Sequence, residues 1–256
     1  MLFRSQILPP ALTGVPNLAW ERFTAEEAWS LIYANPGHRQ RSDPKADGSL
    51  NLRYYGRAGK TDLHAVARAS DRFGLEAGGA FSTVPHESLE LHGSFLQIKR
   101  DEFGKSPAKA LAGFTWTFES GWSVIGEAWW DGTAPTATDW QNLSARARQL
   151  RSVLPAPAVP GALAGLTRMF QLPNYSRQTA LAHFGWTDPA GSGWSANFDL
   201  LRTLEDRGYT LTAAASYEAD KLRVDFGVRR FGGSPDSAYR LLPEKGLLFI
   251  GVSLAL

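Results

Sequence analysis

The segment His92-Gly93-Ser94 places an imidazole and a hydroxyl two residues apart. On a β-strand, residues at this spacing lie on the same face, where a histidine base could activate a serine nucleophile. Strand alternation also puts both residues on a face rich in charged residues, where they would simply line a polar surface.

Other enzymatic chemistry has little support in the sequence. The chain has no cysteine, so disulfides, thiolate metal sites and cysteine nucleophiles are absent. His64, Glu76 and His92 have no metal-ligand spacing, and the glycines lie in strand-like segments instead of a phosphate-binding loop. The formal net charge of +2 does not indicate a nucleic-acid-binding surface. We expect neither a metal nor a cofactor.

A larger set of polar residues alternates with apolar ones and is expected to share one face of a sheet. Charges of both signs are interspersed there, which predicts either a water-filled pore with ion selectivity or a closed core of ion pairs. Five arginines among them would bind an anionic solute if they cluster, as closure of the sheet into a barrel would allow: Arg53, Arg57, Arg68, Arg223 and Arg229. The candidates are Arg53, Arg57, Arg68, Glu76, His92, Glu127, Arg177, Asp199, Arg223, Asp225 and Arg229.

Residues 132–174 form a connection too long to be structureless. Thr138-Asp139 followed by WQNLSARARQLRSVL predicts a capped basic helix of roughly 14 residues. One interpretation is a plug, a gate or a partner-docking element, and the other is a surface loop packed on the rim. The residues concerned are Trp140, Arg146, Arg148 and Arg151, of which the arginines could also contact acidic headgroups of lipopolysaccharide.

Alternation of period two runs through most of the chain and predicts thirteen strands. The segment 24–35 would also make an amphipathic helix with an acidic first turn after Thr24, and Leu2–Leu8 could supply a fourteenth strand, so twelve and fourteen strands both remain open. The predicted strands are 17–23, 28–35, 50–58, 62–70, 73–82, 88–100, 109–119, 122–131, 175–186, 194–204, 209–218, 222–229 and 248–256.

Most of these strands are longer than those of soluble sheets, and their apolar faces are rich in aromatic residues, including several of the 9 Trp. Strands of this length suit a tilted bilayer crossing, whereas no run of about 18 apolar residues could form a transmembrane helix. Every long predicted connection also falls at the same end of the sheet. The first twenty residues match a secretory signal poorly, which leaves the signal absent, removed or upstream.

Residues Leu50 to Leu256 therefore resemble a bacterial outer-membrane β-barrel in architecture. The resemblance implies a Gram-negative outer membrane, contact with its lipid and lipopolysaccharide, and a final strand ending in an aromatic residue, where this chain has Leu256. The spacing of His92 and Ser94 is similar to that in outer-membrane phospholipases and lipid A deacylases. That resemblance implies an Asn or Glu some residues later that orients the histidine, and Glu102 is the only candidate for it in the segment 101–108.

The sequence thus predicts one all-β domain over residues 1–256, an antiparallel up-and-down transmembrane β-barrel of 12–14 strands. Residues 1–49 would form an N-terminal segment and first hairpin, and residues 132–174 a partly helical external loop. We expect a porin-like channel for small polar or anionic solutes. The alternatives are a non-conducting barrel that acts as scaffold or protein partner in an envelope complex, an outer-membrane lipid hydrolase, and a soluble β-sandwich.

Overall fold

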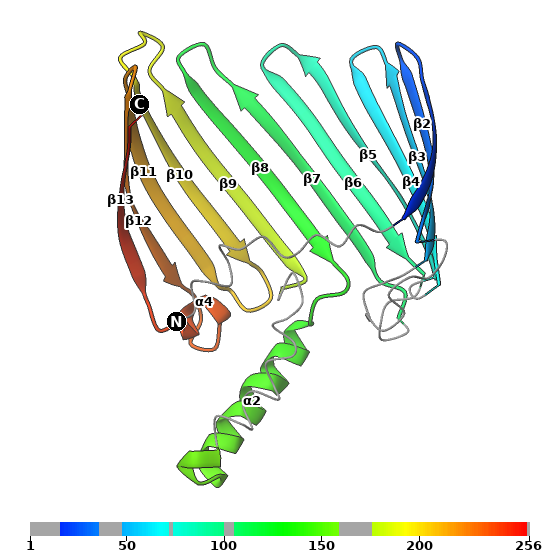
Figure 1. The fold of residues 1–256 in the computed structure, drawn as a ribbon. Coiled ribbons are helices and arrows are strands. Elements are labelled where there is room, and N and C mark those ends of the chain that lie inside the picture. The colour runs from blue at the N-terminus through cyan, green and yellow to red at the C-terminus, as the bar shows by residue number, and fades with distance from the viewer. Residues whose placement is uncertain (1–15, 36–47, 72–73, 100–104, 159–175, 255–256) are drawn as a thin grey trace.

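The chain folds as an all-β antiparallel sheet of thirteen strands, each paired with its neighbours in sequence (Figure 1). The computed structural model describes residues 16–35, 48–71, 74–99, 105–158 and 176–254. Among these residues no ladder joins β1 to β13, so the sheet is open. Figure 1 shows that the sheet is curved, with β1–β4 on one side and β10–β13 on the other.

All thirteen predicted strands are present, with bounds that shift by a few residues. The segment that could have been helical is β2, since its alternating residues pair on both sides within the sheet. The strands are β1 (Asn17–Phe23), β2 (Glu27–Ala34), β3 (Ser49–Ala58), β4 (Thr61–Ser70), β5 (Gly74–His86), β6 (Leu89–Ile98), β7 (Ala108–Thr117), β8 (Trp122–Asp131), β9 (Gln178–Thr187), β10 (Trp194–Thr203), β11 (Tyr209–Glu218), β12 (Leu222–Gly232) and β13 (Gly246–Leu254).

Strand β5 is longer than the predicted 73–82 because it continues through a register shift between Thr83 and His86. A bulge of this kind adds residues to one strand of a pair and interrupts the alternation from which the strand end was predicted.

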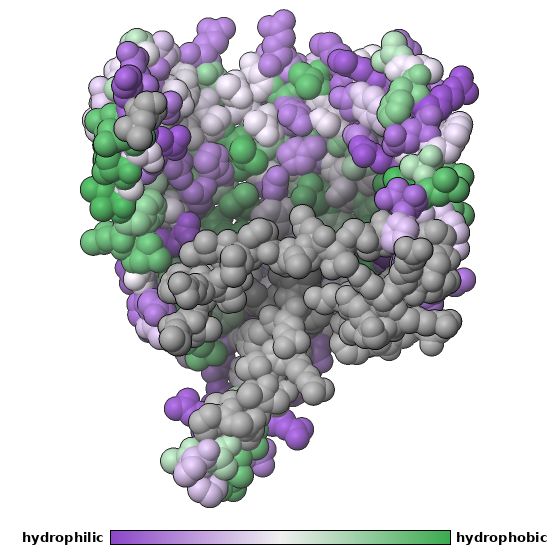
Figure 2. All heavy atoms as spheres, viewed as in Figure 1, coloured by the Kyte–Doolittle hydropathy of each residue, from purple (hydrophilic) through white to green (hydrophobic). Residues whose placement is uncertain are grey.

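The register gives the sheet two chemically distinct faces. Residues opposite each other in a ladder share a face, so Arg68, opposite Glu76, and Asp199, opposite His183, belong to one continuous polar face. Side chains on this face meet across an intervening strand, as they do on the inside of a curved sheet, so we call it the concave face. The other, outward face carries large exposed apolar side chains such as Phe114, Phe198 and Ile250. Figure 2 shows apolar side chains on the outside of the sheet.

Connection lengths differ between the two ends of the sheet. At the short-turn rim the connections are 24–26, 59–60, 87–88, 118–121, 188–193 and 219–221. At the long-connection rim they are 35–48, 71–73, 99–107, 132–177, 204–208 and 233–245. The longest connections therefore fall at one end, as the sequence predicts, and two short ones accompany them.

Helix α2 (Ala137–Val153) begins in the connection 132–177, and a 3-10 turn, η1 (Ala156–Ala158), follows it. A second helix, α4 (Ala238–Leu241), lies in the connection 233–245. No helix among the described residues is long and apolar enough to cross a membrane. Leu2–Leu8 and Glu102, to which the sequence assigned a fourteenth strand and a histidine-orienting role, lie outside the described residues.

The cap of α2 differs from the prediction. Thr136, not Thr138, is the N-cap, and Asp139 is the third helical residue. Thr136 Oγ1 accepts a hydrogen bond from the Asp139 backbone N–H at 3.1 Å, while Asp139 Oδ2 accepts one from the Thr136 N–H at 2.9 Å. The helix thus starts one residue before Thr138, because this capping box satisfies two backbone donors at once.

We expect Thr136→Ala to weaken α2 by about 1 kcal/mol, with Thr138→Ala as the matched control.

The same substitution should change the pKa of Asp139. The Thr136 hydroxyl, which donates to Asp139, and then the Thr136 N–H lower the pKa of Asp139. Thr136→Ala should therefore raise this pKa toward its ordinary value. Because the folded pKa is lowered, the contribution of Asp139 to stability is present above the unfolded pKa and is lost as pH falls through the folded pKa. Carboxyl carbon NMR titration measures the change in the Asp139 pKa, and amide hydrogen exchange in α2 measures the loss of helix stability. An equal response in Thr138→Ala would contradict the assignment.

Candidate functional site

The concave face carries a histidine–carboxylate pair between strands that are not neighbours. His92 Nε2 on β6 lies 3.2 Å from Glu127 Oε1 on β8, and β7 runs between them. The residue of β7 opposite both is Gly113. A Cβ at Gly113 would lie 2.5 Å from His92 Nε2 and 2.9 Å from Glu127 Cγ, so the absence of a side chain allows this contact. Both side chains are about one-fifth exposed.

A second histidine–carboxylate pair lies on the neighbouring strands. His183 on β9 contacts Asp199 on β10 directly opposite it, with Nδ1 and Oδ1 2.5 Å apart. Asn197 donates a hydrogen bond to the second carboxylate oxygen of Asp199 at 2.8 Å. Asp199 thus has a partner for each oxygen, as a partly buried carboxylate requires.

Most of the other charged residues predicted for the concave face also have a polar partner. The closest atom pairs are Arg68–Glu76 at 3.5 Å, Arg57–Asp62 at 3.8 Å and Arg223–Asp225 at 3.1 Å. Arg229 Nε donates to Thr212 Oγ1 at 2.9 Å. The concave face is therefore a surface of paired charges of both signs. Alternation along the strands predicts that these residues share one face.

The structure does not bring the five predicted arginines together. Arg53, Arg57 and Arg68 lie on β3 and β4 near one edge of the open sheet, and Arg223 and Arg229 lie on β12 near the other. Their clustering would require the two edges to meet, and it stays a prediction.

Two cavities line the wall between β1 and β8. The first, of about 330 Å³, is bordered by Glu21, Ser30, Arg53, Tyr55 and His64 among others. Ser30 donates a hydrogen bond to Glu21 at 3.1 Å, whereas Arg53 has no ion-pair partner within the described ranges. The second, of about 390 Å³, is mainly apolar and is bordered by residues of β4 to β8, including Ser94, Lys109, Leu111, Trp129 and Asp131. Arg53 is thus the cation of the concave wall best placed to receive an anion.

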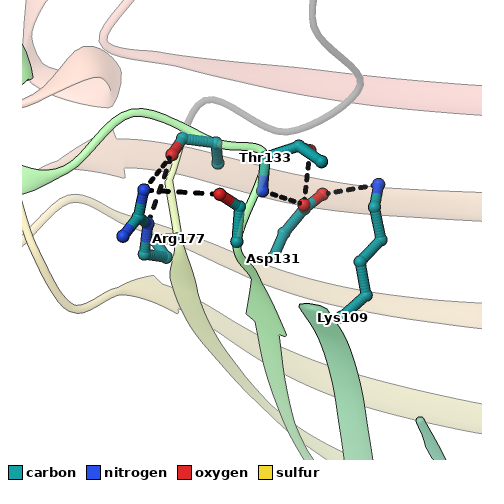
Figure 3. Close-up of polar contacts among 6 residues, drawn as sticks. Lys109, Asp131, Thr133 and Arg177 are labelled. Carbon is teal, nitrogen blue, oxygen red and sulfur yellow. Dashed lines mark hydrogen bonds and ion pairs between the residues drawn. The ribbon is translucent and has the colours of Figure 1, made fainter. Parts of the chain in front are cut away.

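A hydrogen-bond network fixes the start of the connection 132–177 at the long-connection rim (Figure 3). Asp131 accepts from Lys109 Nζ at 3.1 Å and from the Thr133 N–H at 2.9 Å. The Arg177 guanidinium donates to the carbonyl oxygens of Gly132 and Ala134, and it also lies 5.7 Å from the centre of the Trp130 ring. These contacts tie both ends of the connection to β7, β8 and β9.

Helix α2 is attached to the connection between β12 and β13. The Trp140 indole N–H donates to the Asp236 carbonyl at 2.6 Å, and Arg148 forms an ion pair with the Asp236 carboxylate. Trp140 is buried, whereas Arg146 and Arg151 are exposed. Figure 1 shows α2 extending away from the rim. Trp140 and Arg148 therefore hold the helix at the rim, and a gating role for these residues stays a prediction.

The structure gives His92 a hydrogen-bonding contact with Glu127 and none with Ser94 among the described residues. The described part of the chain contains no group of three side chains able to hold a metal ion.

Sequence reasoning missed the roles of Gly113 and Glu205. Glu205 accepts hydrogen bonds from Ser176 Oγ at 2.6 Å and from the backbone N–H groups of Arg177 and Gln178. An acidic residue in a short, charged connection gives no sign of such partners. Gly113 could have been found from the register, since it is the residue opposite both His92 and Glu127.

Comparison of the chain with protein-family models gives no match, and comparison with curated protein sequences gives none either.

Proposed function

We propose that the chain forms a transmembrane β-barrel in the outer membrane of a Gram-negative cell, with a lumen that passes small polar or anionic solutes. The observation that carries the proposal is the distribution of charge between the two faces of the sheet. In the described strands the outward face carries charged side chains only near the rims: Arg22, Glu27, Arg202 and Arg230. A face contacting lipid must lack charge at mid-height, whereas a face contacting water need not.

Aromatic side chains on the outward face support the same placement. At the short-turn rim they include Trp122 with Trp186, at 6.4 Å between ring centres, and Trp194 with Tyr217, at 5.2 Å. Trp130 lies on the same face of β8 as Trp122, toward the other rim. With a rise of about 3.3 Å per residue, the strand between these two tryptophans is about 26 Å long. A tilt of 35–45° reduces this to about 20 Å, close to the apolar height of about 25 Å in such barrels.

The properties of the concave face favour a lumen that passes solutes, and they argue against an interior closed by its own side chains. Its ion pairs are mostly one-fifth exposed or more, and the 330 Å³ cavity beside Arg53 leaves room for solvent. Paired charges of both signs line the wall, so the unpaired Arg53 would bias passage toward anions.

Planar-bilayer conductance of the refolded chain tests the proposal, with heat-modifiable gel mobility as the check that a barrel has formed. We expect stable current steps with modest anion preference, and a reduced preference in Arg53→Gln because that variant removes the unpaired cation. The matched control is Arg22→Gln on the outward face, which should leave selectivity unchanged. A heat-modifiable but silent protein would contradict the channel and favour the scaffold alternative. A chain that never enters bilayers would contradict the barrel itself.

A further inference from the structure

An outward-facing basic patch lies at the long-connection rim, on β10, β11 and β12. Arg202 of β10 is opposite Tyr209 of β11, and Arg230 of β12 is opposite Leu211 of β11. All are on the outward face. Strands are spaced by about 4.8 Å, so β10 and β12 lie about 10 Å apart. Two long arginine side chains can reach a single anionic group across that distance.

The polar groups of this patch have no partners among the residues that the structure describes. Arg202 and Arg230 are exposed, and neither forms an ion pair or side-chain hydrogen bond with any residue that the structure describes. A Cβ at Gly232 would lie 2.4 Å from the hydroxyl of Tyr209, so the phenol ring lies flat over Gly232. The Tyr209 hydroxyl is likewise without a partner in the described part of the chain. Two cations and one hydroxyl therefore face outward together.

Acidic residues nearby do not neutralise the patch, because they are engaged elsewhere. Glu205 accepts three hydrogen bonds from residues 176–178. Asp206 accepts from the backbone N–H groups of Gly208 and Ala238, at 2.9 and 2.8 Å. The cations are thus left for an external anion.

We propose that Arg202, Tyr209 and Arg230 bind the phosphate groups of an anionic lipid headgroup in the leaflet at the long-connection rim. The inference rests on the proposed insertion in a membrane. Two observations identify an anionic lipid as the ligand of this patch. Its charge is opposite to that of the two arginines, and the patch continues into the apolar outward face through Leu200 and Leu211. A ligand that contacts both the patch and this apolar face must carry an anionic group above acyl chains, and the phosphate of a phosphorylated lipid matches the planar donors of arginine.

The test is a titration of the full chain, folded in neutral detergent, with lipid A, followed by native mass spectrometry. Arg202→Gln/Arg230→Gln should weaken binding about thirtyfold, since each cation near a lipid surface contributes about fivefold. Arg202→Lys/Arg230→Lys should lose less, because the charges remain and only the planar donors are lost. Lipid A without its phosphates should bind the protein and the double glutamine variant equally weakly.

Arg22→Gln is the matched control, because Arg22 is also outward-facing and exposed but lies at the short-turn rim. It should bind lipid A as the unaltered protein does. Unchanged affinity in Arg202→Gln/Arg230→Gln would assign the patch to another anionic partner and overturn the inference. Insertion into vesicles of phosphatidylcholine, whose zwitterionic headgroup has no net charge, does not depend on an anionic lipid and is read by heat-modifiable mobility. Failure of that insertion would instead contradict the proposed function.

Discussion

Ala112→Arg is expected to lower the free energy of unfolding in a phosphatidylcholine bilayer by about 2–4 kcal/mol, the cost of an arginine at mid-height on a lipid-facing strand. Ala112 lies in the middle of β7, outward-facing and exposed, between Gly93 of β6 and Ala128 of β8. Neither neighbour offers a polar group, so the guanidinium would have to reach toward a rim or draw water into the bilayer.

The matched control is Thr115→Arg on the same strand, facing the opposite way. Thr115 is opposite Glu90 and Ile125 on the concave face, so the new cation would have a carboxylate beside it. We expect its effect to stay within about 0.5 kcal/mol. Urea unfolding in vesicles, followed by tryptophan fluorescence, measures both variants. Equal stability of the two would mean that the outward face meets water, which is the behaviour of a soluble sheet.

Strands were predictable here because most of them alternate between an apolar face and a more polar or smaller-residue face. In β12, for example, Val224, Phe226 and Val228 alternate with Asp225 and Gly227, and no helical period fits that pattern. The same alternation predicts which residues share the concave face, including both members of Arg68–Glu76 and of His183–Asp199.

Contacts that depend on curvature or on backbone groups were not predictable. The pairing of His92 with Glu127 requires knowing that two strands separated by β7 approach on the inside of the curve. The partners of Arg177 are carbonyl oxygens of Gly132 and Ala134, which have no side-chain signal in the sequence. The N-cap depended on which of two nearby threonines had an acidic residue three positions later, and Thr136 rather than Thr138 has it.

Gly113→Ala is the second variant with a large expected effect, a loss of about 1–3 kcal/mol of stability from overpacking. The new Cβ would meet not only His92 Nε2 and Glu127 Cγ but also the backbone carbonyl oxygen of Gly126 at 2.9 Å. The two side chains could swing apart, at the cost of their 3.2 Å contact, but the carbonyl belongs to the β7–β8 ladder and moves only with the strand.

Gly251→Ala separates this effect from the general consequence of replacing a strand glycine. Gly251 also lies on the concave face, opposite Asp225, but the nearest atom to its added Cβ would be Asp225 Cβ at 3.9 Å. That substitution should be neutral or stabilise by up to about 1 kcal/mol, since it restricts the unfolded chain without a clash.

Combining Gly113→Ala with His92→Ala tests the cause of the loss. If the methyl group acts by displacing His92, removing that side chain makes room, and the double variant should lose less stability than the two single losses together. Urea unfolding of the four proteins in one lipid composition gives the coupling. Strict additivity would mean that the clashes with Glu127 Cγ and the Gly126 carbonyl account for the loss without His92. In that case Gly113 would maintain the approach of two strands, and the histidine–carboxylate contact would only take advantage of the space.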